Sequence, residues 1–128
     1  MTFKRTLFFI TLLLPILSAC QSGDQARKLA DELPLDDQRP TFAFFFTNGW
    51  GPWQQMEPVV NRLEEDYGHQ VKFLYLNAND EGKSAFEAGN FRGHPSFILM
   101  SPDGKELWRG AGIVSDDLLE TAVIEALE

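Results

Sequence analysis

An apolar run, a short turn and a helical pattern follow one another between residues 41 and 67. The run Thr41–Phe46 is apolar on both faces, as expected for a strand that helices cover on each side. The turn reads Phe-Thr-Asn-Gly-Trp-Gly-Pro-Trp over residues 46–53, and apolar residues then recur at helical spacing through Leu63. A tight strand-to-helix turn lies at the carboxyl end of a sheet, where α/β proteins usually place their sites.

The rest of the chain predicts the element order helix, strand–helix–strand, helix, strand–strand–helix. A strand, a helix and a second strand in sequence favour a right-handed unit with parallel strands. Pro102-Asp103-Gly104 is typical of a hairpin turn between the last two strands. We expect helices at 24–33, 52–67 and 79–88 and one capped by Ser115, with strands at 41–47, 70–77, 96–100 and 105–109. The stripe expected to be buried on the last helix is Leu118, Leu119, Ala122, Val123, Ala126 and Leu127, and Asn79 or Asp80 is the expected cap of the third helix.

The N-terminus has the pattern of a signal peptide. Lys4 and Arg5 precede an apolar run from Leu7 to Leu17, and small residues follow before Cys20. The run is shorter than the roughly 20 residues that an ordinary membrane-spanning helix needs. The chain of 128 residues is long enough for one compact domain but not for two.

Leu-Ser-Ala-Cys at residues 17–20 resembles the lipobox of bacterial lipoproteins. The resemblance implies cleavage before Cys20, acylation of the new N-terminus, palmitate being one such acyl group, and anchoring in a lipid bilayer. The expected division is a signal peptide at 1–19, a lipid-attached tether and N-terminal helix at 20–40, and one domain at 41–128. Gln21, rather than an aspartate, favours the outer membrane, with the domain facing the periplasm. The alternative is an ordinary secretory signal with an incidental cysteine.

Charge and cysteine content exclude several kinds of function. Removal of Lys4 and Arg5 takes the formal charge from −8 to −10, so nothing favours nucleic acid as a partner. Cys20 is the only cysteine, and its lipidation would leave no free thiol and no disulfide. His69 and His94 are the only histidines, and no cluster of metal ligands surrounds either in the sequence, so we expect no metal and no cofactor.

Two motifs give the chain a resemblance to the thioredoxin-like fold family. Trp50-Gly51-Pro52-Trp53 is similar to the redox motif Cys-Gly-Pro-Cys, and Pro58 follows Trp53 at the family's spacing of five residues. The segment Phe91-Arg-Gly-His-Pro-Ser-Phe97 is similar to the one that ends in the family's cis-proline. The resemblance covers residues 41–128. It implies an α/β thioredoxin-like fold with a central mixed sheet flanked by helices, either complete or without the first edge strand, and a cis-Pro95 facing the turn.

Departures from the family pattern remove its chemistry. Trp50 stands at the nucleophilic cysteine position and Trp53 at the resolving one, while Phe44 replaces a buried acid and Gly49 the family's tryptophan. Thiol–disulfide exchange needs a thiolate and a second thiol, and indole supplies neither. A shifted register, with Trp50 as the family tryptophan and Gly51 at the missing cysteine, contains no thiol either. We therefore expect no enzymatic redox activity.

The same turn suggests a binding role instead. Tryptophan offers a large apolar face and one N–H donor, and aromatic residues often anchor interfaces. We expect a groove that holds an envelope protein or peptide, in a chaperone-like role. Its alternatives are a decayed site filled by tryptophan, a structural envelope domain, and an oxidoreductase that uses an unlipidated Cys20. The candidate groove residues are Trp50, Gly51, Pro52, Trp53, His94 and Pro95.

Overall fold

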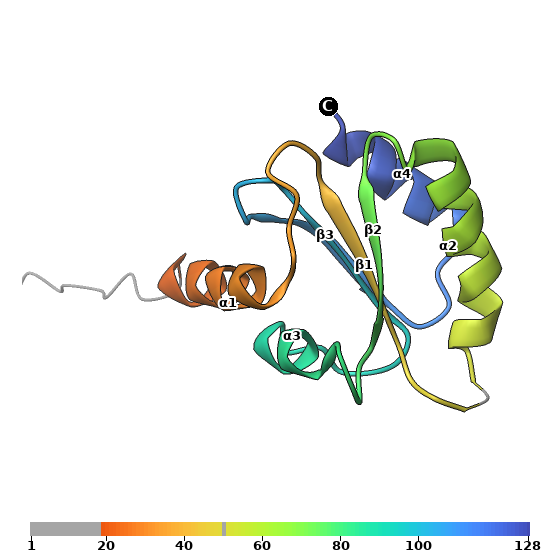
Figure 1. The fold of residues 1–128 in the computed structure, drawn as a ribbon, viewed down its shortest axis with the longest axis horizontal. Coiled ribbons are helices and arrows are strands. Elements are labelled where there is room, and N and C mark those ends of the chain that lie inside the picture. Colours follow the sequence, from red (N-terminus) through yellow and green to blue (C-terminus); the bar gives the residue numbers. More distant parts are fainter. Residues whose placement is uncertain (1–18, 50) are drawn as a thin grey trace, which may run out of the picture.

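The computed structural model describes residues 19–49 and 51–128 and shows a sheet between two layers of helices (Figure 1). Helices α2 and α4 lie on one face of the sheet, and α1 and α3 lie on the other. No helix in the described part of the chain is long and apolar enough to cross a bilayer. The elements are α1 (Ala19–Glu32), β1 (Thr41–Phe46), α2 (Trp53–Tyr67), β2 (Lys72–Asn77), α3 (Lys83–Ala88), β3 (Ser96–Met100), β4 (Glu106–Ala111) and α4 (Asp116–Ala126).

The sheet has the strand order β2-β1-β3-β4. Strand β1 pairs in parallel with β2, with Thr41 opposite Lys72, and antiparallel with β3, with Thr41 opposite Met100. Strands β3 and β4 form the predicted antiparallel hairpin, so both strand pairings expected from the sequence are confirmed. Strand β2 is an edge of this sheet, because the described residues form no strand beyond it. Within residues 19–49 and 51–128, the fold is therefore the version without the first edge strand.

Strand β1 lies inside the sheet because its side chains are apolar on both faces. Phe42 and Phe44 belong to the cluster beneath α2 and α4, and Ala43 and Phe45 belong to the cluster beneath α1 and α3. All four are at most 1% exposed. This period of two follows directly from strand geometry.

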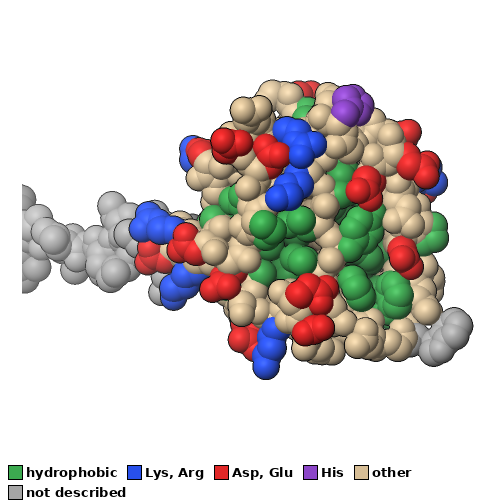
Figure 2. Space-filling view, viewed as in Figure 1, with side chains coloured by type: hydrophobic (Ala, Val, Ile, Leu, Met, Phe, Trp, Pro, Cys, Tyr) green, Lys and Arg blue, Asp and Glu red, His purple; other side chains and the backbone are tan. Residues whose placement is uncertain are grey.

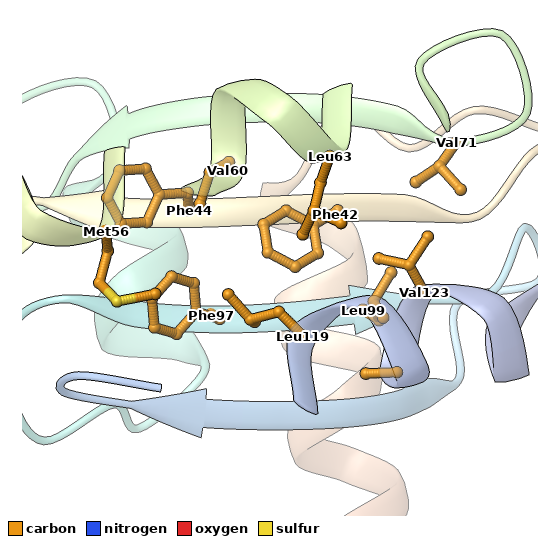
Figure 3. Close-up of a cluster of buried hydrophobic side chains, with 11 residues drawn as sticks. Phe42, Phe44, Met56, Val60, Leu63, Val71, Phe97, Leu99, Leu119 and Val123 are labelled. Carbon is orange, nitrogen blue, oxygen red and sulfur yellow. The ribbon is translucent and has the colours of Figure 1, made fainter. Parts of the chain in front are cut away.

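The larger cluster fills the space between the sheet and helices α2 and α4 (Figure 3). Burial of large apolar side chains of this kind is the dominant favourable contribution to folding, about 1.5–3 kcal/mol for each. Its members are Phe42, Phe44, Met56, Val60, Leu63, Val71, Phe97, Leu99, Leu119, Ala122 and Val123.

The smaller cluster joins α1 and α3 to the other face. Leu29 and Leu33 from the α1 side are 0% and 5% exposed within it. Helix α1 begins at Ala19 rather than at the predicted residue 24, so the segment expected as a tether is helical in the structure. The helix is therefore packed as part of the folded body.

Two details of the helices differ from the sequence prediction. Helix α3 begins at Lys83 rather than near residue 79, and neither Asn79 nor Asp80 caps it. Leu118, predicted to be buried, is 51% exposed, so the buried face of α4 is narrower than its apolar composition suggested. The predicted cap of α4 is confirmed, since the Ser115 hydroxyl accepts a hydrogen bond from the Leu118 N–H.

Candidate functional site

The turn between β1 and α2 follows the end of the central strand. Gly49 has a φ of +106°, a conformation that side chains rarely adopt, and no neighbour would touch a Cβ there. Gly51 is half-buried, Pro52 is exposed as the N-cap, and α2 begins at Trp53. Trp50 lies outside the described residues. Glycine at position 49, where the family has tryptophan, therefore suits the backbone of the turn.

Trp53 is held within the turn by its own contacts. Its ring centroid lies 5.3 Å from that of Phe46, and its Nε1–H donates a 2.9 Å hydrogen bond to the Gly49 carbonyl. The indole N–H is thus already used inside the protein. What Trp53 still offers to a ligand is apolar surface on a half-buried ring.

Asn77, at the end of β2, ties the turn to the loop that follows. Its side-chain amide donates a 2.8 Å hydrogen bond to Asn48 and accepts one of 2.9 Å from the Asn79 N–H. Its backbone N–H donates to the Glu81 carboxylate at 2.7 Å, which lowers the pKa of Glu81. This link was not predicted; an asparagine at the end of the predicted strand was its only signal in the sequence.

The peptide bond between His94 and Pro95 is cis, as the sequence predicted. Pro95 is buried, and its carbonyl accepts a 2.9 Å hydrogen bond from the Gly112 N–H. This bond brings the loop after β4 against the proline. Ile113, the next residue in that loop, is 57% exposed and was not among the predicted site residues. An isoleucine in a loop, two residues before the predicted cap Ser115, was the signal that could have pointed to it.

His94 does not meet Trp53 in the described structure. Its exposed ring stacks on Phe86 of α3, with centroids 4.9 Å apart and planes 20° from parallel. Phe86 packs with Phe45 on the α1–α3 side of the sheet, whereas Trp53 packs on the α2–α4 side. Of the predicted groove residues, the rings of Trp53 and His94 therefore pack on different sides of the sheet. Within the described residues, no group of three or more acidic, histidine or cysteine side chains could hold a metal ion.

Phe44, which the resemblance puts at the position of a buried acid, is part of the core. It is 1% exposed, and its ring stacks on that of Phe97 at 5.3 Å and 13°. No titratable group therefore occupies this position beneath the turn.

A hollow of about 330 Å³ opens beside the turn, between α2 and the edge strand β2. The Tyr75 hydroxyl lies 2.7 Å from the Glu64 carboxylate and 2.9 Å from the Asn61 side-chain oxygen, and it can donate a hydrogen bond to either. Partial burial, the bond to Glu64, and the charges of Glu64 and Glu57 raise the pKa of Tyr75. The lining residues are Phe44, Phe46, Trp53, Glu57, Asn61, Glu64 and Tyr75.

A larger hollow of about 870 Å³ lies away from the turn, between α1 and the β3–β4 hairpin. Its lining mixes both signs of charge, including Arg27, Asp31, Asp103 and Lys105. It is an open groove without a set of converging groups, so size alone does not make it the better candidate.

Comparison with solved structures places the fold among the thioredoxins. A thioredoxin from Nicotiana alata matches with a TM-score of 0.63 and 27% identity, over 71% of this chain and 76% of that one. A point mutant of thioredoxin from Halobacterium salinarum matches with a TM-score of 0.63 and 25% identity, over 82% of each chain. Fasciola hepatica thioredoxin matches at 0.61 and 24%, over 70% of this chain and 82% of its own. No protein-family model matches the sequence.

These matches, the mixed sheet flanked by helices and the cis-proline define the class: an α/β protein. The chain has a thioredoxin-like fold, and the resemblance seen in its sequence is confirmed at that level.

Proposed function

We propose that this chain is a lipid-anchored module that binds a protein or peptide of the bacterial envelope and performs no thiol chemistry. The observation that carries the proposal is the turn itself. It stands where thioredoxins carry their redox motif, and both cysteine positions hold tryptophan. The only cysteine, Cys20, lies at the start of α1, away from the turn in sequence.

The surroundings of the turn support binding. Trp53 presents a ring already fixed by Phe46 and Gly49, so a ligand would meet a surface whose side-chain freedom is largely lost before binding. Ile113 adds exposed apolar surface on the loop that is bonded to Pro95. Trp50 belongs to the proposed surface by its place in the sequence.

Position in the cell is the second part of the proposal. After removal of a signal peptide at 1–19, an acylated Cys20 would hold the chain on the outer membrane, facing the periplasm. Helix α1 runs from Ala19 towards the buried Leu29, so Cys20 lies only about 14 Å along the helix from the core. The lipid would then hold the folded body close to the bilayer.

Site-specific crosslinking in the native envelope tests the binding role. We expect the wild-type chain to capture a defined set of polypeptides, and the variant Trp50→Ala/Trp53→Ala to lose them while remaining folded. The variant Trp108→Ala is the matched control, because Trp108 lies on β4 and packs against the core beneath α2 and α4. Equal capture by wild type and the double variant would exclude the turn as the binding surface.

Mass spectrometry of the purified chain tests the anchor. We expect an N-terminus at Cys20 that carries acyl chains, and we expect Cys20→Ala to abolish both the acylation and the cleavage at that point. A free thiol at Cys20 would contradict the anchor and would favour the alternative, a thiol-dependent oxidoreductase. An insulin-reduction assay of the same material would then decide between the two.

A further inference from the structure

The hollow beside the turn combines two chemistries that recognise an organic cation. Aromatic rings from β1, β2 and α2 form its walls, and the carboxylates of Glu57 and Glu64 stand on it. Rings of this kind attract a cation through their negative faces, most strongly where water is partly excluded. A flexible alkyl stem can pack along the rings while its charged head meets the carboxylates.

The arrangement follows from the periods of the two elements that form it. Trp53, Glu57, Asn61 and Glu64 are spaced by four, four and three residues, which puts them on one face of α2. Tyr75 lies opposite Phe44 in the sheet register, and its side chain rises on the same side.

The carboxylates of the hollow are not neutralised by the described residues. The ion pairs among the described residues are Arg39–Asp36, Arg62–Asp116, Lys105–Asp103 and Arg109–Glu106. Neither Glu57 nor Glu64 has a cationic partner among them. The negative charge at the hollow is therefore open to a cation from outside, in a chain that is acidic throughout. Figure 2 shows hydrophobic side chains gathered on the face where β2 lies, with acidic side chains beside them.

The β2 edge of the sheet indicates that a polypeptide carries that cation. The backbone N–H groups of Lys72 and Ala78 donate towards β1, to Pro40 and Phe46. By the alternation of a strand, the backbone groups of Phe73 and Tyr75 point the other way, where the described residues form no further strand. An extended polypeptide can bind such an edge by adding a strand to it.

Register connects the edge to the hollow. A residue directly opposite Tyr75 on an added strand has its side chain on the same face of the sheet, with the two Cβ atoms about 5 Å apart. That face holds Glu57 and Glu64. We propose that the β2 edge binds an extended polypeptide segment and that the hollow takes a lysine or arginine side chain from it. This inference rests on the proposed polypeptide-binding function and names its partner chemistry.

Binding of short peptides to the full chain, held in a non-ionic detergent and followed by calorimetry, tests the inference. The probe is acetyl-Thr-Val-Arg-Val-Thr-amide, and its partner carries citrulline, which is uncharged but has nearly the shape of arginine, at the centre. We expect the arginine peptide to bind at least tenfold more tightly. Equal affinity of the two peptides, or binding of neither, would overturn the proposal.

Two further arms locate the site. The variant Glu57→Gln/Glu64→Gln keeps the shapes and hydrogen-bonding oxygens but removes two charges, so we expect it to lose the preference for arginine over citrulline. The control Glu65→Gln/Glu87→Gln removes the same charge elsewhere and should keep the preference. An unchanged preference in the first variant refutes the hollow as the site. Equally tight binding of N-acetylarginine amide alone refutes the strand addition.

The two proposals fail separately. If the chain does not prefer the arginine peptide to the citrulline peptide but its envelope crosslinks are found, the turn remains a binding surface and the cationic pocket is rejected. Crosslinking that survives removal of both tryptophans rejects the turn, whereas the comparison of arginine with citrulline in the chain with intact tryptophans still decides the hollow.

Discussion

The ionisation of Tyr75, which depends on the carboxylates of the hollow, affects the stability of the fold at alkaline pH. Partial burial and the nearby carboxylates raise its pKa above the ordinary value near 10, so the folded state keeps the phenol neutral. In the unfolded chain the phenol loses its proton as the pH rises past about 10. The unfolded state then binds fewer protons than the folded state, and the free energy of unfolding falls as the pH rises through this range.

Tyr75→Phe should therefore flatten the alkaline loss of stability. The variant has no phenol to ionise, so its free energy of unfolding should decrease less than that of the wild type between about pH 9 and pH 11. Urea unfolding at a series of pH values, followed by circular dichroism, measures the difference. Tyr67, whose bond to Glu120 also raises its pKa, is present in both chains and contributes equally. Parallel pH profiles for the two chains would contradict the role assigned to Tyr75.

At the scale of elements, the start of α3 shows what hydrophobic periodicity cannot predict. The sequence from Asn79 to Ala88 reads as one helix, but Asn77 first fixes a turn with its side chain and carbonyl. A residue such as asparagine competes with the helix by bonding to the nearby backbone. The helix therefore begins only at Lys83, after Gly82, which lies close against the end of β2.

Gly82→Ala tests that close approach. A Cβ at this position would lie 2.8 Å from the Leu76 Cβ and 2.9 Å from the Asn77 carbonyl oxygen, and backbone atoms cannot move aside easily. We expect a loss of about 1–3 kcal/mol in the free energy of unfolding, as for other overpacked sites. Gly23→Ala is the control, because its Cβ would meet open space within α1 and alanine favours a helix by up to about 1 kcal/mol. A stabilised Gly82→Ala variant would show that the approach is looser than described.

Much of the fold was predictable from elements whose pattern has a single interpretation. The phenylalanine-rich strand β1, the parallel pairing and the hairpin at Pro102–Gly104 follow from alternation, chain order and turn chemistry. The cis peptide bond at Pro95 and the turn between β1 and α2 were also predicted, the first from the resemblance and the second from the strand-to-helix pattern. The hollow was not predicted, because it depends on side chains that only the packing of α2 against the β2 edge brings together. Leu118 shows the same limit: composition gives an apolar helix, but packing decides which residues are covered.

At the scale of the whole molecule, α1 belongs to the folded body. The sequence pattern assigned this helix to the segment that follows the lipid. In the structure its Leu29 is fully buried among side chains of β1, β3 and α3. The Gln25 side chain also donates a 2.7 Å hydrogen bond to the Gly89 carbonyl at the end of α3. These contacts predict that α1 and the sheet unfold as one cooperative unit.

Leu29→Ala measures how strongly α1 is coupled to the rest. Loss of a fully buried leucine typically costs about 2–5 kcal/mol, because the lost burial adds to the cost of the cavity. We expect that loss to appear equally in tryptophan fluorescence, which reports on the turn and β4, and in circular dichroism, which reports on all helices. Lys28→Ala, on the exposed side of the same helix, should change stability by less than about 0.5 kcal/mol. An early transition seen by circular dichroism alone would mean that α1 separates from the sheet first. Under the proposed anchoring, the helix would then be a spacer between the lipid and the domain, and the proposed binding surface would lie farther from the bilayer.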